Sequence, residues 1–143
     1  MIVLDTNVVS ELMRLSPDPA VTAWVSRHPA ASLYITTVTE AEIRYGLAIM
    51  SAGERRTRLA QAVEAMLQED FAGRVLGFDS AAARAYAVIA AKRRRIGNPI
   101  SQFDAQIAAV AASRDSGIAT RNVADFENCG VEVFDPWASS GLS

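Results

Sequence analysis

The chain has 143 residues, of which 14 are Lys or Arg and 16 are Asp or Glu, so its formal net charge at pH 7 is −2. A chain of this length can bury a sufficient core without disulfides or metals as staples. The charge excludes a broad basic surface for nucleic acid or anionic membranes, so any polyanion must be bound locally. The lone Cys129 excludes an intrachain disulfide and a cysteine-rich zinc site, and we expect a buried or idle thiol.

The N-terminal region resembles neither a signal peptide nor a membrane anchor. No basic segment precedes the first apolar run, and no stretch approaches the ~20 apolar residues that a membrane helix requires. We therefore expect a soluble, cytoplasmic protein with no membrane partner.

Short β-branched runs alternate with longer helical patterns along the chain, which predicts an α/β fold with a parallel sheet. Five strands are predicted, at MIVL (1–4), SLYIT (32–36), RVLGF (74–78), GIAT (117–120) and VEVF (131–134). Helices are predicted over 6–13, from 18 with Asp18 as N-cap, and over 37–50, 54–69, 80–95 and 101–113, with a short turn after Asn122. No long linker divides the chain, so we expect one domain over 1–137 and a disordered tail at 138–143.

Polar residues follow two of the predicted strands directly. Asp5 ends the first apolar run, and Asn122 and Asp125 come after the strand at 117–120. Ligands of parallel α/β sheets bind outside the carboxyl ends of the strands, so these two stretches can meet there. A carboxylate between apolar runs loses hydration, which disfavours its charge unless something nearby compensates.

Two further acids lie on apolar helix faces. Glu40 has Arg44 four residues later, which is typical of an exposed ion pair, whereas Glu42 has no cation in reach along the helix. Asp104 shares its face with Ile100 and Ile107 and also lacks a basic partner. We therefore predict that Glu42 and Asp104 face inward.

Helix capping is the alternative explanation for each acid. Asp5 can cap the helix that follows it, and the three-residue spacing of a capping box occurs at Thr39 and Glu42, Ser101 and Asp104, and Asn122 and Asp125. Capping tolerates solvent, however, and does not require acids on an apolar face. The occurrence of several such acids in one chain therefore favours a single explanation for all of them.

Converging acids predict a metal site. Two carboxylates ~4 Å apart repel by about 4 kcal/mol at an effective dielectric near 20, so cations must sit between them. With oxygen ligands and no His or Cys cluster, Mg²⁺ or Mn²⁺ is the expected ion. Such an ion neutralises phosphate oxygens and activates water, which indicates phosphodiester hydrolysis.

Four motifs in this order resemble the PIN-domain ribonucleases, in particular the VapC and FitB toxins of bacterial toxin–antitoxin modules. They are MIVLDTNVVSEL, TTVTEAEIRYGL, NPISQFDAQIAA and IATRNVADFENCGVEVFDPW, and the resemblance extends to about Trp137. It implies a three-layer PIN-like fold, a metal-dependent endoribonuclease that acts on tRNA or other structured RNA, a homodimer and a cognate antitoxin.

Carried over residue by residue, the family's acidic quartet falls on Asp5, Glu42, Asp104 and Asp125, as catalytic and metal-binding residues. The accessory polar positions fall on Thr6 and Asn122, with Thr120 as a further candidate that could orient a metal-bound water. Thr6 and Asn122 also fit a role as turn or capping residues.

RNA contact requires local positive charge. The candidates are Arg121, next to the predicted site, and the run Lys92, Arg93, Arg94 and Arg95. The run also suits a helix C-terminus, where cations complement the macrodipole.

Aromatic residues are too few and scattered to indicate base specificity. We interpret Phe103 and Phe126 as core residues, Trp24 and Tyr45 as packing in the core or at a dimer face, and His28 as a helix-end residue.

Two other functions fit part of this pattern. A phosphatase with a nucleophilic aspartate after the first strand needs a second Asp two residues later, where this chain has Asn7. A non-catalytic, metal-stabilised module that binds a partner needs no complete acidic set, yet the set here is complete.

Overall fold

Five short parallel strands form the central sheet, in the order β3-β2-β1-β4-β5. Their bounds are β1 (Ile2–Leu4), β2 (Leu33–Thr36), β3 (Val75–Leu76), β4 (Gly117–Ala119) and β5 (Val133–Phe134). The structure is a computed structural model, and it describes residues 1–138. The predicted parallel sheet is confirmed, while the tail predicted at 138–143 falls, except for Ala138, outside the described residues.

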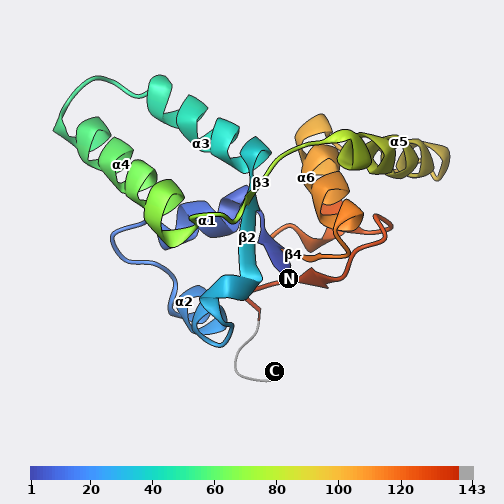
Figure 1. The fold of residues 1–143 in the computed structure, drawn as a ribbon, viewed down its shortest axis with the longest axis horizontal. Coiled ribbons are helices and arrows are strands. Elements are labelled where there is room, and N and C mark those ends of the chain that lie inside the picture. The colour runs from blue at the N-terminus through green and yellow to red at the C-terminus, as the bar shows by residue number, and fades with distance from the viewer. Residues whose placement is uncertain (139–143) are drawn as a thin grey trace.

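Helices cover both faces of the sheet, as predicted. They are α1 (Thr6–Leu12), α2 (Pro19–Ser26), α3 (Thr37–Ala48), α4 (Glu54–Ala65), α5 (Ser80–Arg95) and α6 (Gln102–Ser113), with the short turns η1 (Ala30–Ser32), η2 (Met66–Asp70) and η3 (Val123–Phe126). Figure 1 shows α1, α2 and the α3–α4 hairpin on one side of the strands and the α5–α6 pair on the other.

Alternation along each strand divides the core into two clusters, because successive side chains of a strand point to opposite faces. Val3 and Ile118 pack beneath α5 and α6 with Phe126. Leu4 and Ala119 pack on the opposite side, with side chains of α1, α2 and α4. The sheet is therefore the middle of three layers.

Several local predictions agree with the structure. Asp18 is the N-cap of α2 with Pro19 in the first turn, and Trp24 and Cys129 are buried. His28 lies just beyond the end of α2, where Nδ1 donates to the carbonyl of Trp24 at 2.8 Å.

The structure corrects one prediction and narrows two others. Phe103 is 54% exposed, not a core residue, because α6 meets the core only from Ala105 onward. Tyr45 is 67% exposed, which leaves only the dimer face of its two predicted roles. The helix predicted over 54–69 changes at Met66 to a π-helical turn.

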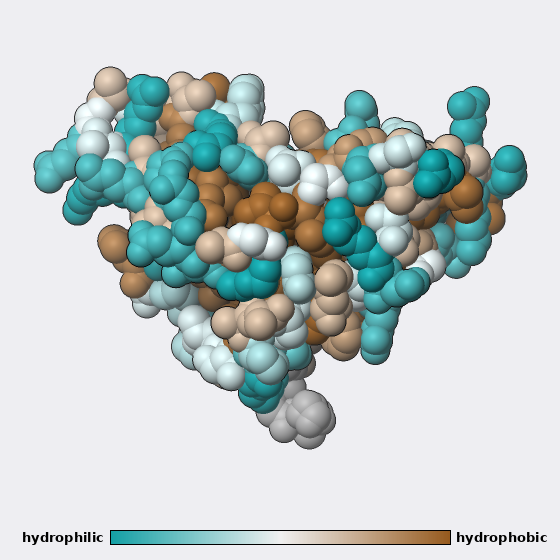
Figure 2. All heavy atoms as spheres, in the orientation of Figure 1, coloured by the Kyte–Doolittle hydropathy of each residue, from teal (hydrophilic) through white to brown (hydrophobic). Residues whose placement is uncertain are grey.

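On one face of the molecule the hydropathy of the surface residues differs between the centre and the edge. Figure 2 shows hydrophobic residues gathered in the hollow between the α3–α4 hairpin and the α5–α6 pair, with hydrophilic residues around it. Within residues 1–138, no helix is long and apolar enough to cross a membrane.

Candidate active site at the carboxyl ends of the strands

Asp5 lies where β1 ends and α1 begins. Its Oδ1 accepts a hydrogen bond from the backbone N–H of Thr6 at 2.8 Å, so it caps α1. Its Oδ2 accepts from the hydroxyl of Thr120 at 2.8 Å, at the end of the neighbouring strand β4. The predicted meeting of these two strand ends is confirmed.

The pKa of Asp5 is raised from 3.8 to about 6. Burial is the largest cause, because Asp5 is only 5% exposed and desolvation disfavours the carboxylate. The hydrogen bonds from Thr120 and Thr6 lower the pKa, and the negative charges of Asp104 and Glu42 raise it. Two of the other predicted acids therefore act electrostatically on Asp5.

Glu42 is half-buried on α3 and faces α1. The hydroxyl of Thr6 donates to Oε1 of Glu42 at 2.8 Å and lies 3.0 Å from the hydroxyl of Thr39. The cap of α3 is Thr36, whose hydroxyl accepts from the N–H of Thr39. The alternative that Thr39 and Glu42 form a capping box is therefore wrong.

Asp104 lies half-buried in the first turn of α6. Its backbone N–H donates to the Ser101 hydroxyl at 3.2 Å, so the capping spacing predicted here is real. Burial raises the pKa of the Asp104 carboxyl, the hydrogen bond with Ser101 lowers it, and the charge of Asp125 raises it. Ser101 thus caps α6 while the Asp104 side chain also faces inward, as predicted.

A pocket of about 560 Å³ brings three of the predicted acids together. It is lined by Asp5, Thr6, Asn7, Ser10, Glu11, Arg14, Glu42, Asp104, Arg121, Asn122 and Trp137. These residues come from β1 and α1, from α3 and α6, and from the segments after β4 and β5. The sheet edge and the surrounding helices therefore build the pocket jointly.

The fourth predicted acid, Asp125, does not line this pocket. It lies exposed on η3, where its charge acts on Asp104. The alternative that Asn122 and Asp125 cap this turn through their side chains is wrong, because Asn122 makes no side-chain capping bond there.

The donor chemistry of the pocket fits a hard divalent cation. The carboxylates supply oxygen ligands, which Mg²⁺ and Mn²⁺ prefer, and Mg²⁺ commonly uses one or two carboxylates while keeping several waters. Among residues 1–138, no three His, Cys, Asp or Glu side chains form a cluster that would hold an ion directly. The fit is therefore to an ion held through few carboxylates and water.

Thr120 and Asn7 form a hydrogen-bond network behind Asp5. The Thr120 hydroxyl accepts from the Asn7 side-chain amide at 3.3 Å and from the backbone N–H of Asn122 at 3.0 Å. The side-chain oxygen Oδ1 of Asn7 in turn accepts from the backbone N–H of Arg121 at 3.3 Å. Sequence reasoning did not identify Asn7 as a site residue, although its place two residues after Asp5 was a usable signal.

The predicted RNA-binding residues differ in their position relative to the pocket. Arg121 lines the pocket, whereas the run at 92–95 contributes none of the lining residues. Arg93 is 2% exposed and donates to the carbonyls of Asn98, Asp125 and Glu127 at 2.6, 2.8 and 3.0 Å. The prediction that Arg93 contacts RNA is therefore wrong, because its donors already bind backbone.

Four lining residues were also missed, namely Ser10, Glu11, Arg14 and Trp137. Glu11 is buried, pairs with Arg14 at 3.0 Å and accepts from the N–H of Asp18 at 2.9 Å. No sequence spacing distinguished it from a surface acid on a helix.

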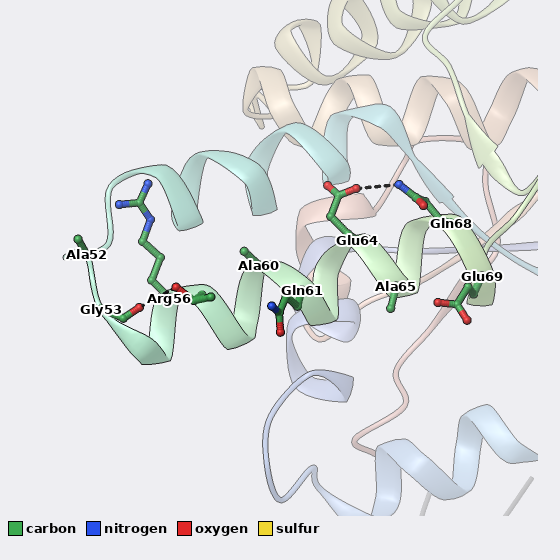
Figure 3. A pocket seen from close by; sticks show the side chains of 10 residues that line it. Ala52, Gly53, Arg56, Ala60, Gln61, Glu64, Ala65, Gln68 and Glu69 are labelled. Carbon is green, nitrogen blue, oxygen red and sulfur yellow. Dashed lines mark hydrogen bonds between the residues drawn. The ribbon is translucent and has the colours of Figure 1, made fainter.

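A second hollow of about 620 Å³ lies along α4 (Figure 3). Its lining runs from Ala52 to Glu69, and Gln68 donates to Glu64 at 3.0 Å. The side chain of Glu64 also pairs with Arg44. This hollow contains none of the predicted acids, so the pocket at the strand ends is the candidate active site.

Comparison with known proteins agrees with the fold. Residues 2–130 match the PIN domain family. The chain is 44% identical to VapC ribonuclease Y4jK of Sinorhizobium fredii over 96% of this chain and 98% of that protein.

Two further relatives span similar lengths. The chain is 37% identical to Toxin FitB of Neisseria gonorrhoeae, over 96% of this chain and 99% of the toxin. The crystal structure of FitAcB from that organism has a TM-score of 0.90, at 37% identity, over 96% of this chain and 99% of that one. The tRNA(fMet)-specific endonuclease VapC of Shigella flexneri is 29% identical over 94% of this chain and 96% of that protein. The chain belongs to the PIN-domain family, among relatives that include VapC ribonucleases and the FitB toxin.

Proposed function

We propose that this chain is the toxin of a toxin–antitoxin pair and acts as a metal-dependent endoribonuclease on tRNA or another structured RNA. The observation that carries the proposal is the convergence of Asp5, Glu42 and Asp104, from three separate elements, on one pocket. The relatives named as a ribonuclease and as a tRNA-specific endonuclease support the same reading.

Asp5, Glu42 and Asp104 are the residues that would hold the ion, in part through bound water, and for this ion we propose Mg²⁺, with Mn²⁺ as a substitute. When bound, such an ion neutralises phosphate oxygens and activates water for hydrolysis. Asp125, beside Asp104, would complete the site from its rim.

The polar neighbours hold these acids in place. Thr120 and Thr6 keep Asp5 oriented through hydrogen bonds to its two oxygens. The Thr6 hydroxyl fixes Glu42, and Asn7 and the backbone of Asn122 fix Thr120. Partners behind a metal ligand orient it and tune the affinity for the ion, so we assign Thr6, Thr120 and Asn7 this role.

The test is cleavage of a bulk tRNA pool by the purified, antitoxin-free protein in Mg²⁺ or Mn²⁺. We expect discrete fragments with 5′-phosphate and 3′-hydroxyl ends, which disappear with EDTA and with Asp104→Asn. Asp115→Asn is the matched control, because Asp115 is exposed and has a positive φ of 53° that Asn also tolerates. Full activity of Asp104→Asn would refute the assignment.

A folded, metal-loaded protein that binds RNA without cutting any RNA tested would instead support the non-catalytic binding module. The phosphatase alternative needs an acid at position 7, where the amide of Asn7 donates to Thr120. A phosphoryl group trapped on Asp5 would revive it.

The proposed assembly includes a second copy of the chain and a cognate antitoxin, with one domain over 1–137 in a cytoplasmic protein. Tyr45 of α3, Ile49 just after α3 and Val88 of α5 are between 67% and 69% exposed, so apolar surface is available for a homodimer. Light scattering measures the molar mass of the purified toxin with and without antitoxin, which tests both the homodimer and the toxin–antitoxin complex.

A further inference from the structure

We propose that Arg121 and Trp137 form a binding site for one unpaired nucleotide at the edge of the acidic pocket. The guanidinium would pair with a phosphate of the RNA, and the indole would stack on the adjoining base. The inference rests on the proposed ribonuclease function and adds to it a subsite beside the acidic pocket, made by two residues outside the acidic set.

The two side chains form a cation–π pair within the pocket. The Cζ atom of Arg121 lies 5.1 Å from the centroid of the Trp137 ring, within the range of a favourable contact. Both residues line the pocket that holds Asp5, Glu42 and Asp104. A nucleotide bound to them would therefore adjoin the proposed metal site.

The sheet brings the pair together. Arg121 follows β4 and Trp137 follows β5, and these strands pair in parallel with Ala119 opposite Phe134. Their carboxyl ends consequently lie at the same edge as Asp5, which continues from β1.

Both residues are held before any ligand binds. The backbone N–H of Arg121 donates to Oδ1 of Asn7 at 3.3 Å, and the backbone N–H of Trp137 donates to Oδ1 of Asp135 at 2.9 Å. The Trp137 side chain packs on the core cluster that contains Trp24, while remaining partly exposed. A backbone fixed in advance, together with the packed indole, loses less conformational entropy on binding.

Charge distinguishes Arg121 from the other arginine of the pocket. Arg14 is ion-paired with the buried Glu11 at 3.0 Å. Within residues 1–138, Arg121 has no carboxylate at ion-pair distance and is exposed. On a chain of net charge −2, Arg121 is thus the cation of this pocket that is available to a phosphate.

The combination of groups identifies the ligand class. Guanidinium groups bind phosphate by paired hydrogen bonds, and aromatic faces stack on bases that have left a helix. Stacking depends little on base identity, since every base has a π-face. We therefore expect the site to select unpaired segments, such as loops, over duplex, with weak sequence preference.

The test uses Trp137 as its own reporter, in EDTA, so that binding is separated from cleavage. Trp24 is the other tryptophan of the sequence, and it is 6% exposed. Titration of the wild-type protein with a single-stranded hexauridylate should quench its fluorescence saturably. The quench should be absent in Trp137→Phe.

Affinity is then measured by anisotropy of a dye-labelled hexauridylate. We expect Arg121→Ala and Trp137→Ala each to raise the Kd by about tenfold or more. Arg58→Ala is the matched control, because Arg58 is exposed on α4 outside the pocket, and should leave the Kd unchanged. A 12-base-pair RNA duplex should compete poorly.

Equal affinity of wild type, Arg121→Ala and Trp137→Ala would overturn the site, as would equal competition by duplex. Circular dichroism melts serve as the control that each variant is folded. If the oligonucleotide binds as expected but no RNA is cleaved, the proposed function fails and the nucleotide site stands. If tRNA is cleaved but these variants bind normally, the nucleotide site alone fails.

Discussion

The Thr120 hydroxyl donates a 2.8 Å hydrogen bond to Oδ2 of Asp5 across 115 positions of sequence, where β4 and β1 end side by side. This bond replaces part of the hydration that Asp5 loses on burial. It also lowers the pKa of Asp5, against the larger effect of burial. The contact therefore keeps a buried carboxylate available to a cation.

Replacement of Thr120 by Val should weaken divalent-ion binding. Val has nearly the same shape but removes the donor to Asp5, so the pKa of Asp5 rises further and its orientation is lost. Loss of such a supporting bond typically costs 10- to 100-fold in metal affinity, which Mn²⁺ titration calorimetry measures. Thr57→Val, at an exposed threonine of α4, is the control. Unchanged affinity in Thr120→Val would contradict the role given to the hydroxyl.

Asp5→Asn should stabilise the metal-free protein at neutral pH. The folded state binds the Asp5 proton more tightly than the unfolded state, because burial raises the pKa from 3.8 to about 6. The ionised carboxylate thus opposes folding above about pH 6, and the penalty fades as the pH falls toward 4. We expect a gain of about 3 kcal/mol at pH 7.5 from urea unfolding in EDTA, and little gain at pH 4. A gain independent of pH would exclude this cause.

Arg93→Met should destabilise the fold, although it keeps much of the apolar length. Three backbone carbonyls lose their donor, two of them at Asp125 and Glu127 in and after η3. Unsatisfied buried acceptors cost about 1–3 kcal/mol each when water cannot reach them, so we expect a loss of about 3 kcal/mol in urea unfolding. Arg94→Met, at the exposed neighbour, should change stability by less than about 0.5 kcal/mol. Equal losses in the two variants would show that Arg93 is not structural.

Gly117→Ala should loosen the β4–β5 pairing. A Cβ at Gly117 would lie 2.8 Å from Cε2 of Phe134 and 3.2 Å from the carbonyl oxygen of Glu132. Overpacking of this kind typically costs about 1–3 kcal/mol, read as a lower melting temperature. Gly77→Ala is the control, because a Cβ there meets nothing within 4 Å. A melting temperature equal to wild type would mean that Phe134 moves aside freely.

The sequence by itself determined the α/β class, the parallel strands and the inward placement of Glu42 and Asp104. These follow from local information, because period-2 and period-3.6 patterns and N-cap residues such as Asp18 and Ser101 act within one element. Residue chemistry likewise indicated an oxygen-ligand site for a divalent ion. These signals require no knowledge of which strands are neighbours.

Tertiary structure alone decided which side chains meet. Arg93 is indistinguishable in sequence from the exposed arginines that follow it, yet helix rotation turns it onto the carbonyls of η3. Phe103 carries the hydrophobic signal of a core residue but precedes the part of α6 that packs. Trp137 reaches Arg121 only because β4 and β5 lie side by side. Contacts between distant segments depend on strand order and helix rotation, which no local pattern specifies.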